Sequence, residues 1–498
     1  MSDRLANGAA WVLGARVYLI FALMVQTTVV ARLLGPEIYG LAAIATMVAA
    51  IVEMATKQSL VTALVQLPEV EEEHLHTAFT LNLCRGLVIA VVLTGLAYPI
   101  ARLYDEPEVT AMLLVLAAST GIFGIANPKL YVLNKRLEFR QDFIRSVLER
   151  SLSLAVSISI ALYYGSYWAV ILGTVAGQLS MVASSFFWQP FLPRLSLAKA
   201  RDLLSFSIWV TLSQFLQAAI TRIDQLLAGY LLGNAVLGTL NVATRISSAP
   251  TQETSFPILN TAFPAFAKLY PDLGKLRPAY QRVQTLVALI SFPVACGMVM
   301  VARPLVDLFL GPQWGQAIIV IQFFAVAFGL EAFTSAVNPL AMAMGRTRSL
   351  FMRTFVTTAV RLAMVIPALW LFGLIGMLVA RLVYGLIFTA VNMRLLREML
   401  GIGYGKLMGV HLRTILGSLV MMVAVWLADF WVRRGTEVFG LLFELVAKVS
   451  IGGAVFVLVL AMMRRITGRP GPEQELLNQV GRVLQRIGFL RKRRKKAA

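Results

Sequence analysis

The chain alternates between long apolar runs and short breaks rich in Gly, Pro or charge, a pattern that predicts membrane-spanning helices. A helix needs about 20 apolar residues to cross a hydrocarbon core about 30 Å thick. Six suitable runs come first, at roughly residues 10–33, 38–64, 77–101, 109–130, 143–164 and 166–188. Six more follow a charged break, at roughly 204–232, 236–265, 281–302, 317–343, 350–371 and 374–393. Two further runs, at 408–432 and 441–463, precede a polar tail.

These runs predict an all-α polytopic membrane protein with fourteen transmembrane helices. The breaks divide it into a first lobe of six helices (residues 1–188), a second lobe of six (189–398), a C-terminal helix pair (399–464) and a tail (465–498). The first run begins near Trp11 and lacks both the short apolar core and the small-residue cleavage site of a signal peptide. It is therefore expected to be a retained helix.

Composition agrees with this interpretation. Hydrophobic residues make up 58% of the 498, charged residues only 14%, and mean hydropathy is +0.76, whereas a soluble domain carries about 25% charged residues. A soluble enzyme is excluded, and no loop is long enough for the catalytic domain of a membrane glycosyltransferase. The two cysteines, Cys84 and Cys296, fall inside apolar runs, so neither a disulfide framework nor a cysteine metal site is expected.

The net charge of +20 could indicate a nucleic-acid partner, but membrane topology accounts for most of it. With a cytoplasmic N-terminus, 31 of the 45 basic residues lie in inner segments and five in outer ones. The positive-inside rule thus places both termini in the cytoplasm, and no nucleic-acid binding is expected. One inner loop, 66–76, is acidic instead. Its His74 and His76 have no clear third ligand, so no metal site and no cofactor are expected.

An internal repeat joins the two lobes. Residues 33–46 align without gaps with residues 231–244, with six identical positions that include Gly35/Gly233 and Gly40/Gly238. Each copy connects the first and second helix of its lobe on the same side of the membrane. The lobes are therefore expected to run in the same direction, as in transporters built from duplicated halves with a site at their interface.

Polar residues follow one face of several predicted spans. In the seventh span eight polar positions from Ser207 to Gln225 fall within an arc of roughly 160° at the helical repeat of about 100° per residue, and the eighth span continues the pattern from Asn241 to Ser255. A helix surrounded by lipid would not carry such a stripe. These faces are expected to line a polar cavity.

Ionisable residues at membrane depth suggest what the cavity holds. The bases at that depth outnumber the acids; they are Arg16, Lys57, Arg85, Arg150, Arg222, Arg245, Arg361 and Arg381, against Glu53, Glu149, Asp224, Glu253 and Glu331. An excess of arginine favours an anionic guest, because guanidinium groups fit phosphate oxygens. Structural ion pairs are the alternative, for example Glu53 with Lys57 or Asp224 with Arg245.

Three segments resemble one known family: Leu-Leu-Gly-Pro-Glu-Ile-Tyr-Gly-Leu at 33–41, Leu-Tyr-Val-Leu-Asn-Lys-Arg-Leu-Glu-Phe-Arg at 130–140, and Arg-Ile-Asp-Gln-Leu-Leu-Ala-Gly-Tyr-Leu-Leu-Gly at 222–233. With the fourteen-span layout, they look like the polysaccharide transporter family of the multidrug, oligosaccharidyl-lipid and polysaccharide exporters. The resemblance implies two six-helix lobes in a V around a central cavity. It also implies flipping of polyprenyl diphosphate-linked sugars from the inner to the outer leaflet of a bacterial inner membrane.

The charges and the resemblance together give a candidate site. Lipid II flippases carry cationic residues on the first, second and eighth helices, and Arg16, Lys57 and Arg245 stand in similar places here. The predicted substrate-binding set is Arg16, Lys57, Arg222, Arg245 and Arg361. The candidates for binding a coupling proton or sodium ion are Asp224, Glu253 and Glu331.

Competing functions and partners remain open from the sequence. One alternative is a cation-coupled multidrug exporter of the same superfamily, which would be expected to have an acidic cavity. A structural membrane scaffold is a third hypothesis. The tail combines an apolar helical face with a basic end, Arg-Lys-Arg-Arg-Lys-Lys at 491–496, which is typical of binding to anionic lipids. Polysaccharide polymerase machinery is a further candidate partner.

Overall fold

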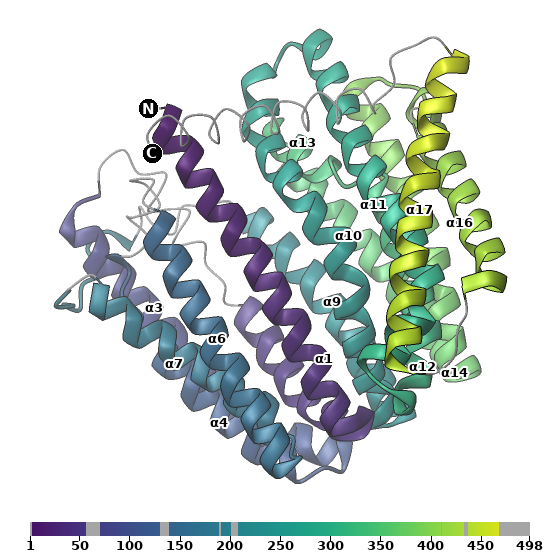
Figure 1. Cartoon of the computed structure of the whole chain (residues 1–498). Helices are drawn as coiled ribbons and strands as arrows, with labels where there is room; N and C mark the ends of the chain where they lie inside the picture. Colours follow the sequence, from purple (N-terminus) through teal and green to yellow (C-terminus); the bar gives the residue numbers. More distant parts are fainter. Residues whose placement is uncertain are drawn as a thin grey trace, which may run out of the picture. The chain divides into compact units, whose positions relative to one another are not determined.

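The described part of the protein is built from helices. A computed structural model describes residues 2–55, 70–129, 139–188, 191–200, 208–409, 411–432 and 437–467, and no strand occurs among them (Figure 1). Within these residues nine helical segments are long and apolar enough to cross a membrane. The prediction of a polytopic all-α membrane protein is therefore confirmed, while the number of fourteen spans stays a prediction.

The helices follow the apolar runs closely. The earlier ones are α1 (Ser2–Ala55), α3 (Glu72–Tyr104), α4 (Glu108–Phe123), α6 (Phe139–Tyr164), α7 (Trp168–Trp188), α9 (Ile208–Leu232) and α10 (Asn234–Leu269). The later ones are α11 (Leu273–Phe309), the 3₁₀ turn η1 (Pro312–Trp314), α12 (Gly315–Ala332), α13 (Val337–Ala343), α14 (Thr347–Leu400), α15 (Tyr404–Gly409), α16 (Leu412–Val432) and α17 (Val438–Thr467).

Single glycines separate spans that the sequence predicted to be distinct. Helix α1 covers the first two predicted spans and is interrupted at Gly35, with φ of 75°. Helix α14 covers two later spans and is interrupted at Gly373, with φ of 60°. Gly233, with φ of 93°, separates α9 from α10. Glycine adopts positive φ at little cost, which explains why the helical pattern breaks at these residues.

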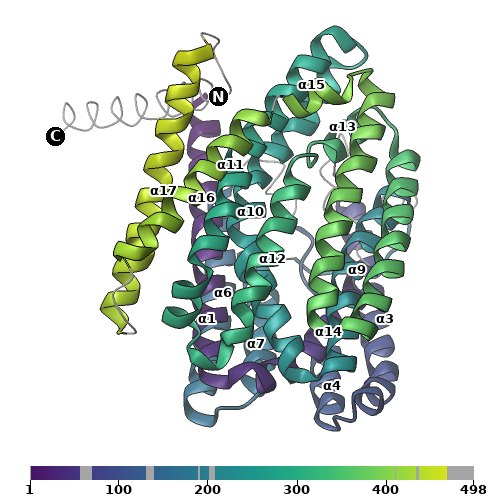
Figure 2. The ribbon, with the colours of Figure 1, turned by 90° about the vertical axis from the view of Figure 1, so that its right-hand side faces the viewer.

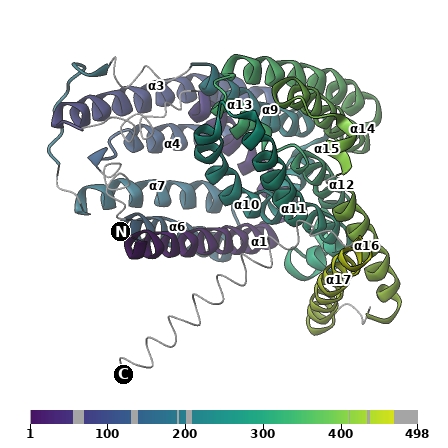
Figure 3. The same cartoon turned by 90° about the horizontal axis from the view of Figure 1, so that it is seen from above.

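The chain forms two compact units: residues 1–245, 309–317 and 351–377, and residues 246–308, 318–350 and 378–498. In the first unit α3, α4, α7, α6 and α1 pack side by side in this order (Figure 3). Alanines such as Ala42, Ala45 and Ala49 of α1 are buried in its core, where small side chains let helices approach closely. The domain boundaries expected from the sequence stay a prediction.

The aligned repeats meet in the first unit. A Cβ atom built on Gly40 would collide with the carbonyl group of Asn234, and one built on Gly238 would collide with the carbonyl group of Pro36. Asn234 is aligned with Pro36, and Gly238 with Gly40. The contact is thus reciprocal, as expected where a two-fold pseudosymmetry relates two segments.

The second unit has its own apolar core. Phe266 of α10, Tyr280 of α11, Leu340 of α13 and Leu396 of α14 are all almost fully buried in it. Helices α16 and α17 pack against each other (Figure 2). Lys448 of α17 lies between two carboxylates, 2.6 Å from Asp429 and 2.7 Å from Glu444. These carboxylates compensate the charge of the lysine between α16 and α17.

Candidate functional site

A cavity of about 330 Å³ lies within the first unit, and three arginines line it. Arg150 comes from α6, Arg222 from α9 and Arg245 from α10. The polar faces of α9 and α10 predicted from periodicity thus contribute to a cavity, at least at Arg222 and Arg245. The walls also include Glu53 of α1 and Glu149 of α6, so three cations share the space with two carboxylates.

The arginines are close enough to repel one another. Arg150, Arg222 and Arg245 line one cavity, so their like charges repel one another, and Glu53 and Glu149 in the same lining offset part of this repulsion. The Nε and Nη2 atoms of Arg150 are buried and have no hydrogen-bond partner among the described residues. A buried donor without an acceptor costs free energy, so an anion that entered the cavity would relieve both the repulsion and the missing hydrogen bonds.

Hydroxyl and amide groups complete the walls of this cavity. The amide of Gln26 donates hydrogen bonds to the hydroxyl groups of Ser157, at 2.7 Å, and Ser153, at 3.2 Å. Gln178, which also lines the cavity, accepts a hydrogen bond at its side-chain oxygen from the hydroxyl of Ser119. These hydrogen bonds hold polar side chains in fixed orientations between helices that are otherwise strongly apolar. The cavity therefore offers both charge and directed hydrogen bonds.

The predicted substrate-binding residues divide into three groups. Arg222 and Arg245 line the cavity together. Arg361 is instead bonded to Asp224, with its Nη2 and Nε atoms 2.5 Å and 2.6 Å from the same carboxylate oxygen. Lys57 and the side chain of Arg16 lie outside the described residues.

The predicted coupling acids also have identified surroundings. Asp224 forms the buried pair with Arg361, and Glu331 lies 2.7 Å from Arg381. The side chain of Glu253 lies outside the described residues. The sequence had left structural ion pairs open as an alternative, and two of the three acids take part in such pairs.

Sequence reasoning left three cavity residues out of the candidate set. Glu53, Glu149 and Arg150 were recognised as charges inside predicted spans but not as parts of one site. Glu53 lies on α1, and Glu149 and Arg150 lie on α6, where they share one helical face with Ser153 and Ser157. The available signals were this polar face and the charges themselves, because an ionisable residue inside a span is by default a functional candidate.

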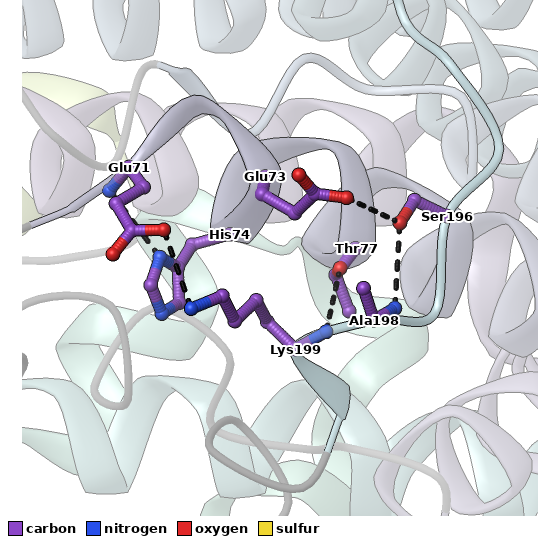
Figure 4. Close-up of polar contacts among 7 residues, drawn as sticks. All are labelled: Glu71, Glu73, His74, Thr77, Ser196, Ala198 and Lys199. Atoms are coloured by element: carbon purple, nitrogen blue, oxygen red, sulfur yellow. Dashed lines mark hydrogen bonds and ion pairs between the residues drawn. The ribbon is translucent and has the colours of Figure 1, made fainter.

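The acidic loop that departs from the positive-inside pattern has a structural role (Figure 4). Glu71 caps the N-terminus of α3, where negative charge is favourable, and it lies 3.3 Å from Lys199. Glu73 accepts a hydrogen bond from Ser196, and Thr77 from the backbone amide of Lys199. Residues 191–200, which belong to the connection between the predicted lobes, therefore pack against the first turns of α3.

Comparison with known proteins identifies relatives of this chain. Residues 29–319 match the family model described as polysaccharide biosynthesis protein. The lipopolysaccharide biosynthesis protein WzxC of Escherichia coli (strain K12) is 24% identical over 70% of this chain and 71% of its own length. The succinoglycan biosynthesis transport protein ExoT of Rhizobium meliloti (strain 1021) is 23% identical over 89% of each chain.

Solved structures with the same fold are transporters. The lipid II flippase MurJ in an inward closed conformation matches with a TM-score of 0.70 at 15% identity, covering 93% of this chain and all of that one. An inward-facing multidrug resistance transporter of the MATE family matches with a TM-score of 0.55 at 15% identity, covering 78% and 94% of the two chains. Since the family model matches more than half of the sequence, this multi-pass membrane protein belongs to the polysaccharide biosynthesis protein family.

Proposed function

We propose that the protein flips a polyprenyl diphosphate-linked oligosaccharide, the repeat unit of an exopolysaccharide, capsule or O-antigen, from the inner to the outer leaflet of a bacterial inner membrane. The family membership and the names of WzxC and ExoT support a role in polysaccharide export. The fold shared with MurJ is compatible with alternating access of two lobes in a V. The protein acts as a transporter and not as an enzyme.

One observation carries the proposal: Arg150, Arg222 and Arg245 line a single cavity. A diphosphate cannot cross about 30 Å of hydrocarbon without replacing its hydration. Guanidinium groups supply the forked donors that phosphate oxygens accept. A cavity of about 330 Å³ also falls within the usual range of roughly 300–1,000 Å³ for small-ligand sites, so the diphosphate and part of the sugar head would enter while the prenyl chain remained in lipid.

The membrane potential assists export in this scheme. With both termini in the cytoplasm and a negative cell interior, outward movement of an anion is favoured by about 2.3 kcal/mol per charge per 100 mV. Neutralisation by the arginines reduces the charge that moves. Of the acids proposed to bind a coupling ion, Asp224 and Glu331 each contact an arginine, and Glu253 stays a proposal. The basic tail would bind anionic lipids, and its residues lie beyond those described.

A cation-coupled multidrug exporter is the alternative function, and the MATE fold similarity is compatible with it. The cavity argues against this alternative, because an organic cation would meet three arginines and only two glutamates. Placing like charges together without compensation is unfavourable. The two functions therefore predict opposite substrate charges.

Reconstituted vesicles can separate the two functions. The full chain and its Arg150→Ala, Arg222→Ala and Arg245→Ala variants would be assayed with a labelled polyprenyl diphosphate sugar and with a labelled organic cation. We expect transfer of the lipid only, and a loss of tenfold or more in at least two variants, whereas Arg102→Ala, which changes an exposed arginine of α3, should transport normally. Transfer of the organic cation, or unchanged lipid transfer in all three variants, would reject the proposal.

A further inference from the structure

Residues 191–200, called the connection below, lie along the first turns of α3 (Figure 4). Three backbone amides of the connection donate hydrogen bonds to side chains of α3; the pairs are Arg194 to His76 at 3.1 Å, Ser196 to Thr80 at 3.0 Å and Lys199 to Thr77 at 3.3 Å. The hydroxyl of Thr80 donates in turn to the backbone oxygen of His76, which orients its own oxygen as an acceptor. Side chains of α3 therefore satisfy these three amides.

Three leucines of the connection have little protein around them. Leu192 is 89% exposed, Leu195 73% and Leu197 60%. Phe191, by contrast, stacks on the ring of His76, with 5.1 Å between the ring centres. One apolar side chain thus packs on α3 while the three leucines project from it. A cluster of exposed apolar side chains marks an interaction surface.

The length of α3 places these leucines relative to the bilayer. Its 33 residues make a helix about 50 Å long, whereas the hydrocarbon core is about 30 Å thick and about 20 residues cross it. Arg102 is an exposed base in the last turn of α3, at the end predicted to be outer. A core that begins there ends near Asn82. His76 and Thr80, which hold the connection, then lie just beyond the core, in the layer of lipid headgroups.

The charges around the connection have both signs. Arg194 and Lys199 are basic, whereas Glu71, Glu72 and Glu73 at the start of α3 are acidic, and Lys199 lies 3.3 Å from Glu71. These residues have no excess of positive charge that would select an anionic headgroup. Leucines do not need one, because apolar side chains enter the boundary between headgroups and acyl chains by burying their surface there.

We propose that the connection is a membrane-binding segment, with Leu192, Leu195 and Leu197 inserted at the headgroup boundary of the inner leaflet and the backbone held by α3. It binds zwitterionic and anionic lipids alike, and the inference does not depend on what the protein transports. A non-helical backbone at this level needs protein groups to satisfy its amides. Thr77 and Thr80, both buried, supply them.

Fluorescence quenching in the full chain tests this proposal. Cys84 and Cys296, the two native cysteines, would be replaced by serine, and Leu195→Cys would carry a nitrobenzoxadiazole label. The protein would be placed in phosphatidylcholine nanodiscs, with and without a lipid whose nitroxide lies near the glycerol end of an acyl chain. We expect quenching at least threefold stronger than for the same label on Lys275→Cys, at an exposed position in the first turn of α11. Equal quenching at the two positions would overturn the proposal.

Lipid charge separates apolar from electrostatic binding. Replacing part of the phosphatidylcholine by phosphatidylglycerol should change the quenching of labelled Leu195→Cys less than twofold, at low and at high salt. A larger increase that high salt abolishes would overturn insertion by the leucines and show a charge-dependent lipid contact instead.

Variants of α3 test how the connection is held. Thr77→Val/Thr80→Val removes both hydroxyl acceptors and keeps the shape, so quenching at Leu195→Cys should fall at least threefold. Thr77→Ser/Thr80→Ser keeps the hydroxyl groups and should retain it, as should Thr94→Val at an exposed position of the same helix. Thermal unfolding would confirm that the variants are folded. Unchanged quenching in the valine variant would overturn the role given to α3.

Variants of the leucines test what enters the membrane. Leu192→Ser/Leu197→Ser removes two of the three apolar side chains, so quenching at Leu195→Cys should again fall at least threefold. The control Leu162→Ser changes a leucine that is 62% exposed near the other end of the first unit's spans, on α6, and should have no effect. Full quenching in the serine variant would show that the leucines do not bind lipid.

Discussion

Two groups of arginines in the predicted spans differ in what surrounds them. Arg150, Arg222 and Arg245 line a cavity where cations outnumber carboxylates. Arg361 and Arg381 each contact a carboxylate directly, at 2.5 Å from Asp224 and 2.7 Å from Glu331. A place inside a predicted span therefore does not by itself assign an arginine to a binding site. Under the proposed function, the distinction lies in whether an arginine forms a buried pair with one acid or lines a cavity in which bases outnumber acids.

Breaking the buried pair tests this distinction most strongly. Arg361 and Asp224 are both almost completely buried, so Arg361→Ala leaves a carboxylate without its partner and should lower the free energy of unfolding by about 3–5 kcal/mol. Thermal unfolding in detergent would measure the loss. The double variant Asp224→Ala/Arg361→Ala should recover part of it. A folded and fully stable Arg361→Ala protein that fails in transport would instead make Arg361 a substrate ligand, as the sequence predicted.

The second pair should matter less. The side chain of Glu331 is 24% exposed, so solvent screens its charge, although Arg381 also lies 5.3 Å from the ring centre of Tyr384. We expect Arg381→Ala to lower the free energy of unfolding by about 2 kcal/mol. Arg381→Lys keeps the charge, so it should lower the free energy of unfolding by less than Arg381→Ala does. A loss as large as that of Arg361→Ala would show that exposure of the partner does not control the cost.

Replacing a cavity arginine should instead raise the free energy of unfolding. Arg150→Met removes two buried donors without a partner and a positive charge that repels the other two arginines of the cavity. The free energy of unfolding in the absence of substrate should therefore rise by about 1 kcal/mol, while transport falls, as is typical where a binding site is kept at the expense of stability. Unfolding and transport would be measured on the same preparation. A variant that is less stable than the unaltered chain would place Arg150 with the structural arginines.

The smallest effect is expected at the surface. The pair formed by Lys199 and Glu71 is solvent-exposed, so Lys199→Ala should cost less than about 1 kcal/mol, and high salt should reduce even that. Unfolding at low and high ionic strength would test it, with Glu71→Gln as the reciprocal change. A loss of unfolding free energy larger than that of Arg381→Ala would mean that the contacts between residues 191–200 and the first turns of α3 stabilise the first unit more than their exposure suggests.

Much of the fold could be predicted because it depends on local chemistry. The length of each apolar run fixes where a helix can cross the bilayer, and the described helices follow those runs. Gly35 and Gly233 stand at aligned positions and both adopt positive φ, which the repeat in the sequence had marked as equivalent. The candidate site was predicted only in part: Arg222 and Arg245 belong to one cavity, whereas Arg150 in the same lining had been noted only as an isolated charge.

The sequence by itself determined that this is a helical membrane protein with more bases than acids inside its predicted spans, since both properties follow from residue type and spacing along one chain. Only the tertiary structure decided how those charges are distributed. Asp224 and Arg361 are 137 residues apart, and no helical period relates them. Whether an arginine meets a carboxylate or lines a cavity depends on how distant helices pack, and packing is settled by the shapes of all the side chains between them.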